Sequence, residues 1–478
     1  MVLTTEQQAA VDARDRDVLV TAGAGSGKTH VLVERYLSLL AGCAVGEIAA
    51  VTFTDAAAAE MRQRVRREVM TRPDLAVHRA DLDDAVIGTI HEVCRQLLRQ
   101  YPFEAGIDPA APVLADDETE FELLAACLDA LEAAAADDHA AALRAVQAIG
   151  VRPLTEALPL LVARRDEVAA AFAALPGDGV DEWTAHVRAR LDAALAAALA
   201  TLLPAIRTSL AAAQALRSGT DRLGDALDAL LAVLDQQPPH APTALLARLA
   251  HVRPPLNIGT KAAWSDRVDD AKAAIREARE AIDALLALPR WNDADEASLA
   301  VLDGLRALFD DACARYAARK RTLGGLDYLD LELEAARLLE THPAVAARCR
   351  AAFRHVMVDE FQDTSPLQMR VIDLLVGRAA PDDGTPRPQL FVVGDAKQAI
   401  YRFRGSDVRQ FNRVHAAIDA TGGAVLHLSQ SFRTHDALIE VLNDLFTAVL
   451  GDGSREFEAP MQRMTGRGGD VPAAPHLT

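Results

Sequence analysis

The segment at residues 22–29, with the sequence AGAGSGKT, constrains the fold of this chain more than any other feature. It follows an apolar run at 17–21 and precedes a helical pattern that begins near Lys28. Glycines between a strand and a helix let the backbone turn tightly, so that several N–H groups and the positive end of the helix face one point. A lysine followed by a threonine completes the pattern of a phosphate-binding P-loop. Ala22 replaces the glycine that opens the strict pattern.

Strand patterns occur in two separate parts of the chain. Apolar runs at 17–21 and 48–53 alternate with helical patterns, and similar runs return at 356–358, 390–393 and 424–428. Alternating strands and helices predict a parallel sheet. We therefore expect an α/β fold whose sheet is built from two stretches of sequence.

Between these stretches the composition changes to alanine- and leucine-rich helical patterns. We expect helix breaks at Pro153, Pro176, Pro204 and the pair Pro238 and Pro239. The predicted organisation is a first part of the α/β domain at 1–109, an all-helical insertion at 110–322, a second part of the α/β domain at 323–424, and the start of a further domain at 425–478.

The charge balance is acidic, with 69 Asp and Glu against 50 Lys and Arg and a formal net charge of −19. This argues against a cationic face that coats duplex DNA, but a locally basic cleft remains compatible with it. The five cysteines are dispersed, without a C-x-x-C pair, which favours a reducing cytoplasm. No signal peptide is visible. The most membrane-like stretch, 193–203, ends at Pro204 and is shorter than the roughly 20 residues of a spanning helix, so we expect no membrane association.

An acidic pair follows the apolar run at 356–358. Asp359 and Glu360 are adjacent at the expected end of a buried strand. In a P-loop protein, the first carboxylate of such a pair can hold Mg²⁺ and the second can orient and deprotonate an attacking water. A helix cap is the less favoured alternative.

The sequence DEFQDT at 359–364, together with AGAGSGKT, resembles the UvrD/Rep/RecB group of superfamily 1 DNA helicases. Further segments occur in the order of that family's motifs: LTTEQQAAV at 3–11, VTFTDAAAAEMRQR at 51–64, GTIH at 88–91, VVGDAKQAIYRFRGSD at 392–407 and QSFRT at 430–434. The resemblance implies a RecA-like P-loop NTPase domain, which uses ATP and Mg²⁺. The start of a second RecA-like domain would follow it.

The resemblance also assigns nucleotide-site roles to single residues. Gln7 would read the adenine edge, Gln398 would sense the γ-phosphate, and Arg433 would act as an arginine finger. Thr29 and Asp359 would hold Mg²⁺. Arg35 is a further candidate, although we favour a surface ion pair for it. The expected nucleotide-binding residues are Gln7, Ala22, Gly23, Ala24, Gly25, Ser26, Gly27, Lys28, Thr29 and Arg35, and the expected catalytic residues are Lys28, Asp359, Glu360, Gln398 and Arg433.

Candidate DNA contacts lie in the other motifs. Hydroxyls can bind phosphates and aromatic rings can stack on bases of a single strand. The expected residues are Thr52, Phe53, Thr54, His91, Tyr401, Phe403 and Arg404. Core burial is the alternative for the two phenylalanines, and a structural role is the favoured alternative for His91. The arginines Arg62, Arg64, Arg66 and Arg67 line either a DNA path or a solvated face.

The long stretch between His91 and Asp359 resembles the RecB and AddA motor subunits of recombination-repair helicase–nucleases rather than the compact UvrD and Rep helicases. The resemblance implies an ATP-dependent 3′-to-5′ helicase that acts on single-stranded DNA and duplex ends with partner subunits. Motifs V and VI of the family are not found after Thr434. The alternatives are a stand-alone UvrD/Rep-type repair helicase and an ATP- and DNA-binding module without autonomous unwinding.

Overall fold

The computed structural model describes residues 3–136, 140–177, 179–235, 242–252, 258–378, 386–402, 405–450 and 461–468. It divides into two compact units. The sheet unit comprises residues 1–125 and 316–478, and the helical unit comprises residues 126–315. The helical unit lies within the insertion predicted at 110–322, and its two ends fall inside two long helices.

The sheet unit is built around six parallel strands, in the order β3-β2-β4-β5-β1-β6. Their bounds are β1 Val18–Ala22, β2 Ile48–Thr52, β3 Val86–Thr89, β4 His355–Val358, β5 Gln389–Gly394 and β6 Ala424–Leu428. The central strands are buried on both faces, as parallel strands between helical layers are. The predicted RecA-like α/β fold with a helical insertion is thus confirmed.

Alternate strand residues enter two apolar layers. Val20 and Val393 pack into one layer with helices α1 Thr5–Asp12, α2 Lys28–Leu39 and α3 Asp55–Thr71. Leu19 and Val392 pack into the other layer. Its helices are α4 Ile90–Gln100, α5 Pro102–Ala105, α16 Tyr328–Thr341, α17 Pro343–Ala352, α18 Pro366–Leu375 and α19 Val408–Ala420. The strands are all parallel, so the loops that follow them lie at one edge of the sheet.

The boundary predicted between 424 and 425 is wrong for β6. This strand pairs with β1 in the six-stranded sheet, so the first domain continues through Leu428. The chain then forms β7 Gln430–His435, helix α20 Asp436–Leu450 and β8 Thr465–Arg467. Strands β7 and β8 make a separate two-stranded parallel sheet.

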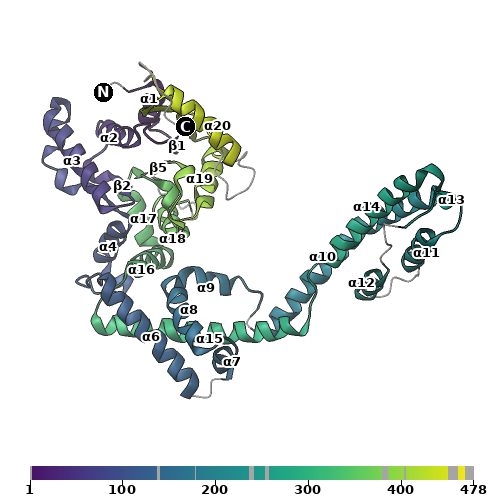
Figure 1. Ribbon diagram of the computed structural model, residues 1–478. Helices are drawn as coiled ribbons and strands as arrows, with labels where there is room; N and C mark the ends of the chain where they lie inside the picture. The colour runs from purple at the N-terminus through teal and green to yellow at the C-terminus, as the bar shows by residue number, and fades with distance from the viewer. Residues whose placement is uncertain are drawn as a thin grey trace. The chain divides into compact units, whose positions relative to one another are not determined.

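The described residues of the helical unit form both short and long helices (Figure 1). They are α6 Asp116–Ala136, α7 Ala140–Ile149, α8 Val151–Ala163, α9 Arg165–Ala173, α10 Val180–Ala215, α11 Arg222–Asp235, α12 Pro242–His251, α13 Lys261–Trp264, α14 Val268–Leu286 and α15 Asp293–Leu323. The helices α10 and α14 pack along each other, around a core that includes Leu210, Trp264 and Ile275.

The helix break expected at Pro204 is wrong. Helix α10 continues through Pro204 for 36 residues, and α8 likewise contains Pro159. A proline removes one backbone hydrogen bond, but the packing of α10 on α14 holds the helix on both sides of it. Tertiary packing therefore overrides the local preference.

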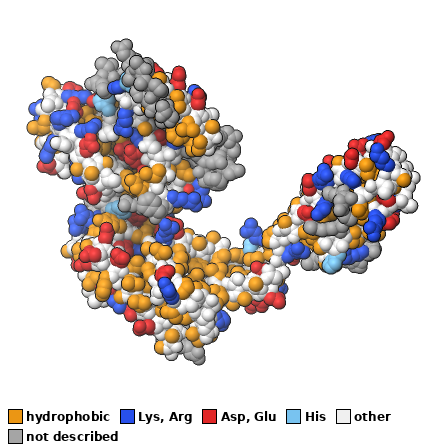
Figure 2. Space-filling view, viewed as in Figure 1, with side chains coloured by type: hydrophobic (Ala, Val, Ile, Leu, Met, Phe, Trp, Pro, Cys, Tyr) orange, Lys and Arg blue, Asp and Glu red, His pale blue; other side chains and the backbone are white. Residues whose placement is uncertain are grey.

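Helix α10 is long and apolar enough to cross a membrane by length and composition alone. Helices α7 and α8, which meet at a bend of 112°, pass the same test when they are taken together as one span. However, Leu199, Ile206 and Leu210 of α10 are buried in the apolar core of the helical unit. On the face shown in Figure 2, acidic and basic side chains are interspersed over α11, α13 and α14. One such helix is weak evidence for a membrane span, because core helices meet the same criteria.

Candidate active site

The predicted site residues come from the loops that follow the carboxyl ends of the parallel strands. The P-loop follows β1, Phe53 and Thr54 follow β2, and His91 follows β3. The acidic pair follows β4, and Gln398 follows β5. Because parallel strands end at the same edge of a sheet, segments hundreds of residues apart in sequence meet there. This is the edge at which α/β proteins bind nucleotides.

The P-loop has the backbone conformation that its sequence predicts. Gly25 and Gly27 have φ values of 77° and 84°, in the left-handed region that favours glycine. A Cβ on Gly27 would lie 2.8 Å from Nε2 of Gln7, so a side chain there would have to displace the Gln7 amide. The Ser26 hydroxyl is buried and donates to the Gly23 carbonyl at 2.8 Å. The Ser26 backbone N–H donates to the same carbonyl at 3.2 Å, so these two bonds fix the turn of the loop.

Lys28 and Glu360 join the two halves of the site. Lys28 Nζ lies 2.7 Å from Glu360 Oε2. Glu360 also accepts a hydrogen bond from Gln362 Nε2 at 2.8 Å. The Glu360 backbone is left-handed, with φ of 47°, which is uncommon for a residue with a side chain and is typical of functional sites. A residue with an uncommon backbone conformation thus holds its carboxylate against the P-loop lysine.

Two further carboxyl groups lie in the same loop. Burial and then the neighbouring Glu360 raise the pKa of Asp359 to about 6, and the same two causes raise the pKa of Asp363 to about 6. The Oδ1 atom of Asp363 is buried without a hydrogen-bond partner among the described residues. Crowded acidic groups with raised pKa values indicate that a positive charge would be stabilised here.

The residues present fit a Mg²⁺ ion. Thr29 supplies a hydroxyl, Asp359 supplies a carboxylate, and both follow strands that end at this edge. Mg²⁺ prefers oxygen ligands and keeps several waters, so one or two carboxylates with substrate phosphates are sufficient. No cluster of three His, Cys, Asp or Glu that could hold a metal occurs in the described part of the chain.

Gln398 is held close to the acidic loop. Its Nε2 donates to Asp395 Oδ2 at 2.9 Å. The Asp395 backbone N–H in turn donates to Gln362 Oε1 at 2.9 Å. One short chain of hydrogen bonds therefore connects Gln398, through Asp395 and Gln362, to Glu360.

Arg433 lies beside the P-loop on β7. Its Cβ would be 2.8 Å from a Cβ placed on Gly25, and the backbone N–H of the preceding Phe432 donates to the Gly25 carbonyl at 2.8 Å. Ser431, which is fully buried, donates to the Ala24 carbonyl at 3.2 Å. The Arg433 side chain is exposed, so its guanidinium is available to a ligand at the loop.

Gln7 supports the P-loop in this structure. Its Nε2 donates to the Ser26 carbonyl at 2.9 Å, and its Oε1 accepts from the Thr4 backbone N–H at 3.0 Å within the α1 capping box. Each end of the amide makes one such bond, which leaves a second N–H and a second lone pair for a ligand edge.

The surface ion pair favoured for Arg35 is wrong. Arg35 is 1% exposed, because helix α1 covers it. Its guanidinium donates to the carbonyls of Ala10 and Ala13 at 2.6 and 2.7 Å and lies 4.3 Å from the centre of the Phe391 ring. Burial lowers the pKa of Arg35 to about 10. Arg35 therefore ties α1 to α2 rather than facing the P-loop.

Two of the aromatic residues predicted to contact DNA lie against each other. The rings of Phe53 and Tyr401 are 5.1 Å apart and tilted by 34°. Thr52 is buried and bonds to the Thr54 carbonyl, and the Thr54 hydroxyl caps helix α3. Phe403 and Arg404 lie outside the described residues.

His91 contacts a buried carboxylate. Its Nε2 lies 2.9 Å from Glu332 Oε1, and its ring is 4.9 Å from that of Tyr328.

The four arginines on α3 contact acidic groups: Glu92, Glu60, Asp83 and Glu68 face Arg62, Arg64, Arg66 and Arg67, respectively. These arginines form a solvated, charge-paired face.

Several residues at the site were not singled out from the sequence. Gln362, Asp363, Asp395 and Ser431 lie inside the motifs quoted above, so their position beside the predicted residues was the available signal. Glu332 and Met464 lie outside them. The Met464 side chain packs directly on Gly23, a contact that no sequence pattern indicates.

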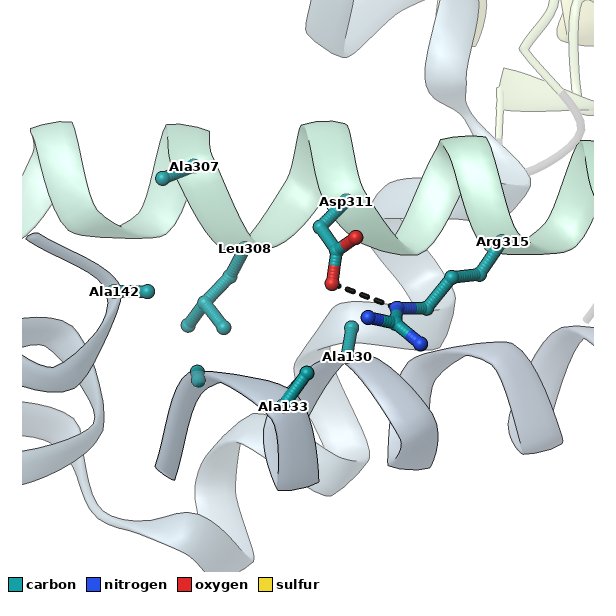
Figure 3. A pocket seen from close by; sticks show the side chains of 8 residues that line it. Ala130, Ala133, Ala142, Ala307, Leu308, Asp311 and Arg315 are labelled. Carbon is teal, nitrogen blue, oxygen red and sulfur yellow. Dashed lines mark hydrogen bonds and ion pairs between the residues drawn. The ribbon is translucent and has the colours of Figure 1, made fainter. Parts of the chain in front are cut away.

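A cavity of about 230 Å³ lies elsewhere, in the helical unit (Figure 3). It is bordered by α6, α7 and α15, and most of its lining is alanine. The charged residues in the lining are Asp311 and Arg315, which pair with each other at 2.8 Å. It contains none of the predicted site residues, so the candidate chemistry belongs to the sheet edge.

The site can be compared with known proteins. A family model described as the UvrD/REP helicase N-terminal domain matches residues 3–419. The chain belongs to this family. Curated relatives named as subunits of an ATP-dependent helicase/nuclease include those of Pelotomaculum thermopropionicum, 29% identical over 99% of this chain and 40% of the relative, and Geobacillus thermodenitrificans, 30% identical over 98% and 41%. The relative from Desulforudis audaxviator is 32% identical over 94% and 40%. The chain thus spans about 40% of the length of these relatives.

Proposed function

We propose that this chain is the nucleotide-binding part of an ATP-dependent 3′-to-5′ DNA helicase or translocase motor that works in double-strand-break repair and recombination. The observation that carries the proposal is the meeting of P-loop, acidic pair and Phe53–Tyr401 at one edge of the sheet. A shared edge allows ATP hydrolysis and single-stranded DNA movement to affect each other. The direction of movement is inferred from the family.

The nucleotide would bind with its phosphates on the P-loop N–H groups, where Lys28 exchanges Glu360 for phosphate oxygens. This exchange would free the Glu360 carboxylate to orient and deprotonate water. Thr29 and Asp359 would hold Mg²⁺, which supplies positive charge to the phosphates when it is bound. Arg433, exposed beside Gly25, would neutralise charge that develops on the transferred phosphoryl group.

Single-stranded DNA would contact the loops after β2 and β5. Phe53 and Tyr401 offer rings for stacking, and the start of α3 offers Thr54 and backbone N–H groups to a phosphate. The names of the relatives, which are subunits of an ATP-dependent helicase/nuclease, support a role alongside partner subunits. By the family resemblance, we propose that this complex is cytoplasmic and acts on duplex ends.

The ATPase rate with and without single-stranded DNA tests the proposal, alongside Lys28→Ala and Glu360→Gln. DNA-stimulated hydrolysis that both substitutions abolish is the expected result. ATP binding that Lys28→Ala weakens, with no turnover in the parent, would instead identify a binding module without a complete motor. A parent that binds neither ATP nor DNA would contradict the proposal.

A further inference from the structure

Glu332, on helix α16, connects two parts of the site that are far apart in sequence. It is only 4% exposed. Its Oε1 accepts a hydrogen bond from Gln368 Nε2 at 2.8 Å and lies 2.9 Å from His91 Nε2. A buried carboxylate is costly unless it is paired. Here one oxygen atom serves both partners, so the position of each partner affects the other.

One arm of this connection, the contact from Glu332 to His91, leads to residues that we expect to contact DNA. His91 lies in the first turn of α4, directly after β3, and is one-third exposed. The ring of Tyr328 lies 4.9 Å from its ring, and Tyr328 itself is 50% exposed. The arm therefore ends in two accessible rings, the kind of surface on which a base can stack.

The other arm reaches the acidic loop. Gln368 is part of the capping box of α18: its Oε1 accepts from the Ser365 N–H at 3.2 Å, and its own N–H donates to the Ser365 hydroxyl at 3.1 Å. Both ends of the Gln368 amide are thus used, one for the cap and one for Glu332. Helix α18 begins directly after the loop 359–364 that holds the acidic pair. A shift of Gln368 therefore reaches this loop through the helix start.

We propose that Glu332 is a positioning residue that couples DNA contact at His91 and Tyr328 to the Asp359–Glu360 loop. The inference rests on the proposed function. A base or phosphate that moves His91 changes the distance between His91 Nε2 and the shared Oε1. The hydrogen bond from Gln368 to the same oxygen changes as a result. This route is separate from the chain through Gln398, Asp395 and Gln362, which reaches the same loop from β5.

The coupling is measured as the ratio of two dissociation constants. A fluorescent, non-hydrolysable ATP analogue with Mg²⁺ is titrated into the chain with and without saturating oligo(dT). Coupling between two binding sites is reciprocal and typically spans roughly 5- to 150-fold. Glu332→Met removes the acceptor at nearly constant volume. We expect the ratio to fall towards one, while each ligand alone binds within about twofold of the parent.

Matched variants separate coupling from general damage. Glu332→Gln keeps an oxygen acceptor and should restore most of the ratio. Glu340→Met removes a carboxylate that also joins α16 to α18, through Arg370, but does not contact His91, and it should leave the ratio unchanged. Gln368→Met breaks the other arm and should lower the ratio like Glu332→Met. It decides the question if Glu332→Met does not fold.

The possible outcomes are distinguishable. Parent-level coupling in a folded Glu332→Met or Gln368→Met variant would overturn the inference and leave the proposed function intact. A parent that binds both ligands without coupling would also overturn it. A parent that binds neither ligand would contradict the proposed function itself.

Discussion

The sheet unit and the helical unit differ in what they bury. Among the described residues, every buried polar or charged side chain lies in the sheet unit, including Asp17, Arg35, Lys320, Glu332 and Asp395. The helical unit buries leucine, alanine and tryptophan around α10, α11 and α14. A buried polar group stabilises only when its partners are placed correctly, whereas apolar packing depends mainly on volume. The stability of the sheet unit should therefore depend on the placement of single polar atoms. The stability of the helical unit should depend on the volume of its buried side chains.

The largest effect should follow from Trp264→Ala in the helical unit. Trp264 is fully buried, and its Nε1 donates to both Asp221 oxygens at 3.0 Å. We expect a loss of about 3–5 kcal/mol in the free energy of unfolding, because such a cavity cannot fully collapse. Urea unfolding with hydrogen exchange of α14 measures it. Trp291→Ala, at a partly exposed ring, is the matched control and should cost less. A parallel loss of ATP affinity would show that the packing of the helical unit also determines the nucleotide site, contrary to this comparison.

Lys28→Ala should weaken ATP binding by about 2–4 kcal/mol, or roughly 30- to 1,000-fold, through the loss of charge-assisted bonds to phosphate. The unfolding free energy should change much less, because the ion pair that the variant loses is partly exposed on its Glu360 side. Isothermal titration calorimetry measures the affinity. Lys261→Ala removes an exposed lysine of the helical unit and should bind ATP like the parent. Equal affinities in both variants would contradict a phosphate role for Lys28.

Phe53→Ala should weaken binding of oligo(dT) by about 1–3 kcal/mol, which is the range for loss of one stacked base. The residue lies against Tyr401 but remains partly exposed, so little stability should be lost. Fluorescence anisotropy at fixed salt measures the affinity. Phe103→Ala removes a phenylalanine that is 95% exposed in the same unit, and DNA binding should not change. If both variants bind equally well, the stacking platform lies elsewhere.

The smallest effect, with the opposite sign, should come from Asp359→Asn. The folded protein raises the pKa of Asp359 from 3.8 to about 6, so it favours the protonated form. The associated stabilisation is present below pH 3.8 and is lost as the pH rises through about 6. Without Mg²⁺ at pH 7.5, the variant should be more stable than the parent by about 1–2 kcal/mol.

Thermal unfolding between pH 4 and 7.5 checks this result, and the advantage of the variant should grow with pH. Asp15→Asn is the control. Asp15 is exposed, and its hydrogen bond with Arg16 lowers its pKa, so this variant should show no such gain. A variant that is less stable than the parent at pH 7.5 would show that the folded protein does not disfavour the ionised form of Asp359.

Features that depend on local sequence were predicted well. The P-loop needs glycines at particular backbone angles, and the acidic pair follows a buried strand, so both are encoded in a few adjacent residues. The parallel sheet followed from alternating patterns. The boundary at 424 failed because an apolar run shows that a strand exists but not which strand it pairs with.

Features that depend on distant packing were not predictable. Arg35 was expected at the surface, but α1 folds over it and supplies two carbonyls. Glu332 lies in a helix with no motif, and its significance depends on two partners that are distant in sequence. Polar residues at such positions read as ordinary charged helix residues until their neighbours are known.

The chain passes from the six-stranded sheet to the two-stranded sheet through one residue, Ser429, between β6 and β7. Its backbone N–H and hydroxyl both donate to Glu6, at 2.8 and 2.6 Å. Both bonds fix the chain at Ser429 to helix α1. The next residues, Ser431 and Phe432, bond to the carbonyls of Ala24 and Gly25, so the strand that carries Arg433 is anchored to the P-loop as well. Glu6 neighbours Gln7, so the crossing between the two sheets is fixed to the same helix that supports the P-loop.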